Sequence, residues 1–497
     1  MTQTGESLEL LYRSSYAALP ERLFARVSPV PVTKPRLLRF NHALGAELGL
    51  DIGEFDAEAL AGIFSGNVIP EGVEPIAMAY AGHQFGHFVP QLGDGRAILL
   101  GEALDRAGVR RDIQLKGSGR TPFSRDGDGR AALGPVLREY IVSEAMHALG
   151  IPATRALAAI ATGEPVFREE ALPGAILTRV AASFVRVGTF QYFAARDDVE
   201  AVRLLADYVI DRHYPQAKTD PQPYLALLRA VTRAQASLIA GWMHVGFIHG
   251  VMNTDNMAVS GETIDFGPCA FLDSYDPAAV FSSIDRQGRY AYGNQPHAAL
   301  WNLARFAETL LPIIDAGADR AVELASEVLA AFSSRFSELS LAGMRRKLGL
   351  AAREDGDAAL AEELLDAMHR NQADFTLTFR RLCDAAEGET GDAGVRSLFA
   401  NPREYDEWAG RWRGRMARDP LEPGARAEAM RRVNPAFIPR NHRIEQVINA
   451  AVEDQDFEPF AKLSAVLSQP YRSQEGFESY ADPPQPDERV HKTFCGT

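Results

Sequence analysis

The first residues whose types and spacing suit chemistry form a glycine-rich turn and a lysine that follows it. Gly93 and Gly95 lie in the stretch 91–96, just before a short apolar run, and glycines at such a turn let backbone amides approach a phosphate group. Alone, such a turn is more often a structural hairpin. Lys116 ends the next apolar run and Glu139 lies in the helical pattern after it, so we expect the two side chains to form an ion pair. The alternative is an exposed lysine and a solvated glutamate.

A second group of polar residues lies between positions 249 and 267. A His-Gly pair is followed there by Asn256 and then by Asp265 of an Asp-Phe-Gly motif, the order in which kinase-like folds carry their two metal ligands. Val251 stands where such folds place the catalytic aspartate, and valine cannot accept a proton. Asp255 is the nearest carboxylate and is the candidate base. The alternative is that Asp255 only caps the loop.

The apolar patterns around these residues predict a small β-rich part followed by a mostly helical part. Short apolar runs broken by glycine and charged residues indicate strands between 82 and 121, and helical spacing continues over 131–149. Longer helices are expected over 199–212, 224–245, 297–314 and 320–338. Two short apolar runs around Gly261 predict a hairpin within the helical part, where such an interruption usually carries function.

These elements predict an α+β protein of the protein-kinase-like, two-lobed type, because a strand lysine paired with a helix glutamate is how such folds hold nucleotide phosphates. The expected segments are an N-terminal extension over 1–75, a β-rich N-lobe over 76–195, a helical C-lobe with the Asp255 loop over 196–430, and C-terminal helices with a tail over 431–497. The tail from 468 onward is rich in turn residues and is expected to lie over the surface or to be partly disordered.

Composition limits the partners and the location. A net charge of -14 argues against a broad surface for nucleic acid, because neutralising phosphates needs clustered positive charge. No apolar run has the length of a membrane span, and residues 1–16 lack the pattern of a secretory signal, so we expect a cytoplasmic monomer that binds neither nucleic acid nor membrane. Cys269, Cys383 and Cys495 lack the spacing of a disulfide framework or a zinc site.

Beyond single motifs, the sequence resembles the selenoprotein O (YdiU-type) family. The resemblance is dense from about position 80 to position 273 and extends to a C-terminal Cys-x-Thr. It is carried, in order, by the stretches 81–86, 91–96, 114–120, 121–125, 126–130, 186–190 and 249–272. So many matches in one order predict membership of that family.

The resemblance implies a pseudokinase fold that binds ATP in a flipped orientation and transfers AMP to Ser, Thr or Tyr hydroxyls of proteins, with Mg²⁺. Under this resemblance, Gly93, Gly95 and Arg96 line the nucleotide, and Asp128 and Gly129 also contact it. Lys116 with Glu139 holds phosphate, and Arg179 and Arg186 bind the phosphate tail. Asp255 is the base, and Asn256 with Asp265 binds the metal. If the resemblance is set aside, the sequence pattern around Arg179 and Arg186 is more often that of surface residues.

The resemblance also implies a redox bridge between Cys269 and Cys495, which takes the place of a terminal selenocysteine. The leading hypothesis is therefore a protein adenylyltransferase that releases pyrophosphate. Two alternatives stay open: transfer of UMP from UTP, with Mn²⁺, and a non-catalytic, ATP-binding pseudokinase scaffold. The paired metal ligands disfavour the scaffold, and Val251 disfavours phosphoryl transfer to a small molecule.

Overall fold

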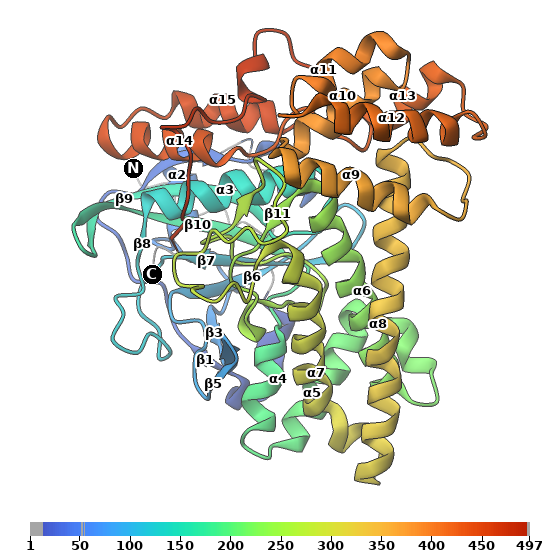
Figure 1. Cartoon of the computed structure of the whole chain (residues 1–497). Coiled ribbons are helices and arrows are strands. Elements are labelled where there is room, and N and C mark those ends of the chain that lie inside the picture. The colour runs from blue at the N-terminus through green and yellow to red at the C-terminus, as the bar shows by residue number, and fades with distance from the viewer. Residues whose placement is uncertain (1–12, 51–52, 54, 495–497) are drawn as a thin grey trace.

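A computed structural model describes residues 13 to 494, apart from 51, 52 and 54. Its centre is an eight-stranded antiparallel sheet in the order β1-β3-β6-β7-β10-β9-β2, with β8 paired to β10 (Figure 1). The strands are β1 (Phe24–Arg26), β2 (Arg36–Phe40), β3 (Ile76–Met78), β6 (Ala97–Leu104), β7 (Arg110–Lys116), β8 (Ala131–Ala132), β9 (Arg155–Phe167) and β10 (Ala171–Ala181). β7 and β10 are neighbours in the middle of this order, so side chains at their paired positions lie side by side.

Both faces of the sheet are apolar, and each is covered by a helix. On one face, α3 (Leu133–Ala148) packs in the same core as Leu177 of β10. On the other face, α2 (Ala57–Ser65) packs in the same core as Ile176 of that strand. Successive residues of a strand point to opposite faces, which explains the alternation. The helix expected over 131–149 begins at Leu133 because the two residues before it form β8 against β10.

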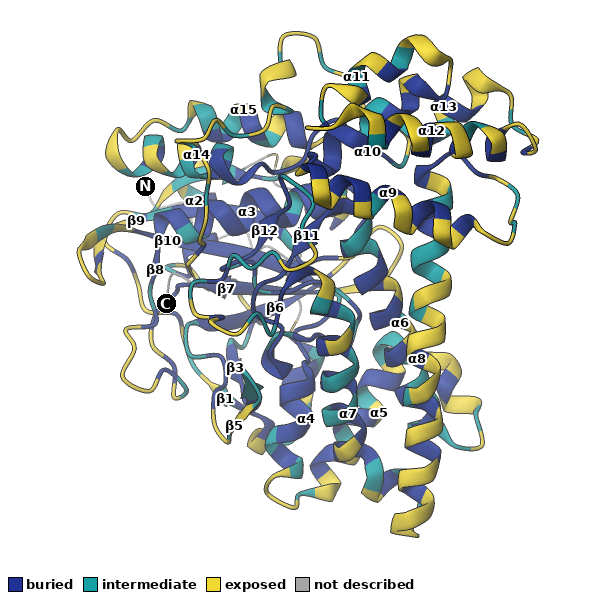
Figure 2. Cartoon of the chain, viewed as in Figure 1, coloured by how far each residue is buried: buried dark blue, intermediate teal, exposed yellow. Residues whose placement is uncertain are grey.

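The part of the chain after β10 is mostly helical, as expected. It contains α4 (Val187–Ala194), α5 (Val199–His213), α6 (Pro223–Val245), α7 (Gln295–Ile314) and α8 (Ala318–Lys347). α8 continues to Lys347 rather than ending at the expected position 338, because Met344 still packs into a core of the helical part. One side of α8 is buried and the other exposed (Figure 2). Among the described residues, no helix combines the length and apolar character that a membrane span requires.

Two further groups of helices complete the chain. The core that contains Met344 of α8, Trp408 and Trp412 is shared by five further helices, α9 (Asp357–Asn371), α10 (Phe375–Ala385), α11 (Asp392–Arg396), α12 (Pro402–Met416) and α13 (Pro423–Arg431). α14 (Asn441–Glu453) and α15 (Glu458–Leu467) return to cover α3 (Figure 1). There the ring of Phe460 lies 5.2 Å from that of Tyr140, and Arg138 forms an ion pair with Glu445. The protein is thus α+β, as predicted.

The hairpin expected around Gly261 is present only in part. A single antiparallel bridge joins Met257 and Thr263 instead of two paired strands. The N–H of Thr263 donates to the carbonyl of Pro152 at 2.9 Å, and the carbonyl of Met257 accepts from the N–H of Val187 at 2.9 Å. Because these backbone groups bond to distant parts of the chain, they cannot extend a local ladder.

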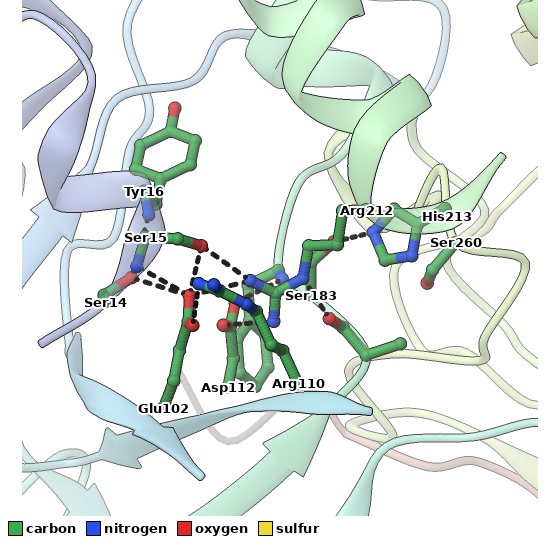
Figure 3. A network of polar contacts seen from close by, with 12 residues as sticks. Ser14, Ser15, Tyr16, Glu102, Arg110, Asp112, Ser183, Arg212, His213 and Ser260 are labelled. Atoms are coloured by element: carbon green, nitrogen blue, oxygen red, sulfur yellow. Dashed lines mark hydrogen bonds and ion pairs between the residues drawn. The ribbon is translucent and has the colours of Figure 1, made fainter. Parts of the chain in front are cut away.

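A buried ion network fastens α5 to the sheet (Figure 3). Arg212 Nη1 donates to Glu102 of β6 at 2.7 Å, and its Nη2 donates to Asp112 of β7 at 2.7 Å. Glu102 also accepts from the backbone N–H of Ser15 at 2.7 Å, so the N-terminal segment joins the same network. The three charged side chains are 6%, 3% and 2% exposed. Removing one partner of such a network leaves a buried charge without compensation.

We expect Arg212→Ala to lower the free energy of unfolding by about 3–5 kcal/mol, because two buried carboxylates lose their cation. Urea denaturation followed by circular dichroism measures this. Lys218→Ala is the matched control: its pair with Asp211 is exposed, with side chains 68% and 59% accessible, and the midpoint should not move measurably. Equal midpoints for the two variants would contradict the structural role of the network.

Candidate active site

Asp265 lies where three cations meet. Its Oδ1 accepts from Lys116 Nζ at 2.8 Å and from Arg179 Nη1 at 2.6 Å, and its Oδ2 accepts from Arg186 Nη1 at 2.9 Å. Burial alone would raise the pKa of Asp265, but the adjoining charges of Lys116, Arg179 and Arg186 hold that pKa well below its usual range. The carboxylate is therefore ionised. Its backbone has a left-handed φ of 63°, which is uncommon for an aspartate and marks a constrained position.

Three elements bring these cations together. Lys116 is the last residue of β7, Arg179 lies on β10 opposite Gln114 of β7, and Arg186 is the N-cap residue of α4. Glu139 of α3 binds two of them, with Oε2 2.5 Å from Lys116 Nζ and Oε1 3.0 Å from Arg179 Nη1. The ion pair expected between Lys116 and Glu139 is therefore present. Arg179 and Arg186 are buried parts of the same cluster rather than surface residues.

A second layer, absent from the sequence analysis, holds the arginines in place. Asp94, between the two glycines of the turn, is buried and accepts from the N–H of Met78 at 3.1 Å and from Gln114 Nε2 at 3.2 Å. Gln114 Oε1 in turn accepts from Arg179 Nη2, and Arg186 Nη2 lies 3.8 Å from Asp94 Oδ1. Burial raises the pKa of Asp94 to about 6, although the positive charge of Arg186 acts to lower that pKa. The two-residue period of a strand puts Gln114 on the same face as Lys116, and this could have indicated that Gln114 belongs to the site.

Asp255 lies beside this cluster on a short turn, and a hairpin covers it. The hairpin consists of β4 (Gly82–Gln84) and β5 (His87–Val89), and Gln84 Nε2 donates to Asp255 Oδ2 at 3.2 Å. Asp255 Oδ1 is buried and has no hydrogen-bond partner among the described residues. Burial raises the pKa of Asp255 to about 6. One carboxylate oxygen is thus held while the other remains available to accept a proton.

Two oxygen ligands for a divalent cation lie in the same region. Asn256 Nδ2 donates to the carbonyl of Val251 at 3.0 Å, which fixes the amide and leaves its oxygen as the free ligand atom. Asp265 supplies the carboxylate. Amide and carboxylate oxygens are the ligands that Mg²⁺ and Mn²⁺ prefer, and such cations keep several of their other positions for water and phosphate oxygens. The pair therefore fits a metal of this class.

The glycine-rich turn packs directly on the segment 121–124. A Cβ at Gly93, whose φ is 78°, would lie 2.3 Å from the ring of Phe123, and one at Gly95 would lie 3.0 Å from the Phe123 carbonyl. Thr121 Oγ1 donates to the carbonyl of Asp94 at 2.7 Å, which pins the turn. The carbonyl of Arg96 accepts from the N–H of Gly117 at 2.7 Å, so the turn is also joined to the residue after Lys116. The turn is therefore placed beside the cation cluster.

Asp128 and Gly129 lie on the loop before β8, where Asp128 is exposed and Gly129 is buried. Asp128 Oδ2 accepts from Arg168 Nη1 at 2.8 Å, and Gly129 has a φ of 70° with its carbonyl bonded to the N–H of Gly119. Within the described residues, no hydrogen bond or ion pair joins these two to Asp265. Their expected contact with the nucleotide remains a prediction.

Cys269 is buried four positions after Asp265, and Cys495 lies outside the described residues. Burial raises the pKa of the Cys269 thiol to about 12, and its Sγ donates to the carbonyl of Phe266 at 3.1 Å. The tail approaches this segment, because Thr493 is buried and its Oγ1 donates to the carbonyl of Pro268 at 2.6 Å. The bridge between Cys269 and Cys495 stays a prediction.

A buried cluster of cations beside a glycine-rich turn is the kind of site that nucleotide phosphates require. Comparison with known proteins gives the family. The family model described as protein adenylyltransferase SelO matches residues 6–468. The chain is 65% identical over 486 residues to the protein nucleotidyltransferase YdiU of Bradyrhizobium sp. (strain BTAi1), covering 98% of this chain and 99% of that protein. It is 63% identical over 492 residues to the protein of the same name from Rhizobium rhizogenes, covering 99% and 98%.

The chain therefore belongs to the SelO/YdiU family and is a nucleotidyltransferase. Its substrate is a nucleotide.

We expect Gly82→Ala to lower turnover by roughly 10²-fold, because the added Cβ would lie 2.5 Å from Asp255 Oδ1 and must displace that carboxylate. Nucleotide affinity, measured by calorimetry, should change little, since the cation cluster is not touched. Gly410→Ala is the control, because nothing lies within 4 Å of its added Cβ on the exposed side of α12. Normal turnover in Gly82→Ala would show that the position of Asp255 is not critical.

Proposed function

We propose that the protein transfers AMP from ATP to Ser, Thr or Tyr hydroxyls of other proteins, with release of pyrophosphate and dependence on Mg²⁺. In this proposal the chain is a protein-kinase-like, two-lobed enzyme that acts as a cytoplasmic monomer, with an N-lobe over 76–195, a helical C-lobe over 196–430 and extensions on either side. The observation that carries it is the convergence of Lys116, Arg179 and Arg186 on one carboxylate next to Asp255.

The cation cluster supports the phosphate-binding part of the proposal. Lys116, Arg179 and Arg186 offer N–H donors that suit phosphate oxygens as well as carboxylate oxygens. When the triphosphate binds, its oxygens replace Asp265 as acceptors for these donors, and the Asp265 oxygens become available to a cation. Positive charge is then already in place where charge builds on the departing pyrophosphate, so little reorganisation is needed in the transition state.

Asp255 supports the transfer step. Its free Oδ1 takes the proton from the acceptor hydroxyl, and the hydroxyl oxygen forms a bond to the α-phosphorus. The bond from that phosphorus to the oxygen bridging to the β-phosphate breaks, and its electron pair leaves with pyrophosphate. Gln84 holds the other oxygen of Asp255 and keeps the carboxylate oriented. Val251, at the usual position of a kinase base, is buried and cannot serve.

Asn256 and Asp265 would hold the metal ion. When bound, Mg²⁺ neutralises charge on the phosphate oxygens and helps to align the chain of phosphates. Among the described residues, no group of three or more His, Cys, Asp or Glu side chains is arranged to hold a metal, so the proposed site would rely on water and phosphate oxygens for its remaining ligands.

Parallel incubations with α-labelled and γ-labelled ATP test the reaction. We expect label on the enzyme or on a protein acceptor from α-labelled ATP only, because AMP is transferred and pyrophosphate leaves. Label from γ-labelled ATP alone would replace the proposal with phosphoryl transfer. A matched incubation with α-labelled UTP tests uridylyl transfer, and repeating each with Mg²⁺ and with Mn²⁺ identifies the metal.

We expect Asp255→Asn to reduce turnover by roughly 10²- to 10⁴-fold through loss of the base, with nucleotide affinity retained. The asparagine keeps the size of the side chain and can still accept from Gln84. Rates of pyrophosphate release, together with nucleotide dissociation constants, separate the two effects. An unchanged rate would move the base to another residue.

Asp265→Ala should abolish metal-dependent turnover but keep nucleotide binding in the presence of a chelator, because Lys116, Arg179 and Arg186 then lose the carboxylate that all three share and bind phosphate in its place. Calorimetry with and without chelator measures this. Lys116→Ala, by contrast, should weaken both binding and turnover. Retained metal-dependent turnover in Asp265→Ala would contradict the assignment of the metal ligand.

A further inference from the structure

The β4–β5 hairpin carries an exposed surface that the transfer mechanism does not use. His87 and Phe88 of β5 are exposed, Phe88 by 40%. The hairpin is nevertheless held firmly to the loop that carries Asp255. The N–H of His83 donates to Thr254 Oγ1 at 2.7 Å, and the N–H of Phe85 donates to Asn253 Oδ1 at 3.0 Å. The exposed side of the hairpin thus has a fixed position relative to the base.

Aromatic rings extend this surface from the hairpin onto α7. The ring of His83 lies 4.9 Å from that of Phe88 and 5.2 Å from that of Trp301 of α7. Two guanidinium groups contact the same indole, with Arg289 4.7 Å and Arg305 5.1 Å from the ring centroid. Stacking on an indole orients a guanidinium and leaves its N–H groups directed to the side. We call Phe88, His83, Trp301, Arg289 and Arg305 the hairpin patch.

Arg289 is the cation of this patch that lacks an internal anion. Arg305 Nη2 pairs with Glu308 at 2.5 Å, whereas no ion pair joins the guanidinium of Arg289 to a carboxylate of the described residues. The carboxylate of Asp285 instead accepts from the backbone N–H of Arg289 at 3.0 Å. Its Nε also has no hydrogen-bond partner. Arg289 is only partly exposed, so its charge is poorly solvated. Arg286, three positions earlier, is exposed and adds positive charge to the same segment.

The rest of the protein has the opposite charge. The chain has 52 basic against 66 acidic residues, for a net charge of -14. An acidic partner is therefore repelled by most of the surface and attracted where unpaired arginines lie. A carboxylate suits Arg289 because its two oxygens match the fork of the guanidinium. A neighbouring apolar side chain of the partner can pack on the exposed ring of Phe88.

We propose that the hairpin patch binds an acidic segment of the acceptor protein, so that the hydroxyl to be modified is flanked by Asp or Glu. This inference rests on the proposed function, because it assumes a protein acceptor at Asp255. Arg289 acts here as a specificity-determining residue. It binds a carboxylate of the acceptor while the hairpin, held to Asn253 and Thr254, sets the distance from that carboxylate to the base.

Three synthetic peptides of equal length test the inference. Each has a central Ser-Thr-Tyr stretch, flanked by Asp in the first, Asn in the second and Lys in the third, and each carries a fluorophore for anisotropy. The full-length enzyme should bind the Asp peptide about tenfold more tightly than the Asn peptide and bind the Lys peptide most weakly. The preference should shrink as salt is raised.

Variants of Arg289 locate the preference. Arg289→Gln should abolish the preference for the Asp peptide by raising its Kd and its KM, with kcat for the transfer and the nucleotide Kd unchanged. Arg289→Lys should keep part of the preference, and Arg289→Glu should reverse it towards the Lys peptide. Arg403→Gln is the control, because Arg403 is 84% exposed on α12 and pairs only with Glu407. It should bind all three peptides as the wild type does.

The binding and transfer measurements separate the two proposals. Equal binding of the three peptides by the wild type, or an unchanged preference in Arg289→Glu, overturns the hairpin patch as an acidic-segment site whatever the transfer assay gives. Charge-dependent binding that Arg289→Glu reverses, without transfer of nucleotide to any peptide, supports the patch and contradicts the proposed reaction.

Discussion

The carboxylate of Asp265 is the interaction on which the arrangement of the site depends, because Lys116, Arg179 and Arg186 all bind it. Three buried cations cannot lie so close together without an anion between them. The three residues come from β7, β10 and the start of α4, so this one carboxylate fixes those elements relative to one another. The same requirement prepares the site for its substrate, since phosphate oxygens can replace the carboxylate as the shared anion.

Under the two proposals above, two sets of cations have different tasks in an acidic protein. Arg179 and Arg186 are buried, oriented by Gln114 and Asp94, and suited to a nucleotide that the site encloses. Arg289 stacks on an aromatic ring at the surface and is suited to a partner that binds transiently. Asp255 lies between the two sets, since its backbone carbonyl accepts from Arg186 and its carboxylate contacts the hairpin. Under the proposed function, the nucleotide binds at the first set of cations and the acceptor at the second, and Asp255 acts on both.

Residue patterns predicted much of the fold and the centre of the site. Helical spacing located α5, α6 and α7 closely, and the order of lysine, helix glutamate and Asp-Phe-Gly motif predicted the ion pair between Lys116 and Glu139. Spacing works for these features because each depends on a local period or a known motif order.

The parts that could not be predicted depend on partners far away in the chain. Gln84 contacts Asp255 across 171 positions, and no local period reports such a pair. The hairpin expected around Gly261 is limited to one bridge for the same reason, since the backbone of Thr263 bonds to Pro152. The role of Asp94 could not be predicted either, because it depends on Gln114 of β7, twenty positions further along the chain.

The packing of α14 and α15 on α3 has a consequence for control of the enzyme. Many enzymes that pair a strand lysine with a helix glutamate are switched off when that helix swings outward and breaks the pair. Here α3 has the sheet on one side and two helices on the other, and Arg138, next to Glu139, is tied to Glu445 of α14. An outward swing would require both helices to detach. The ion pair between Lys116 and Glu139 is therefore held by the packing around α3 and does not depend on a mobile helix.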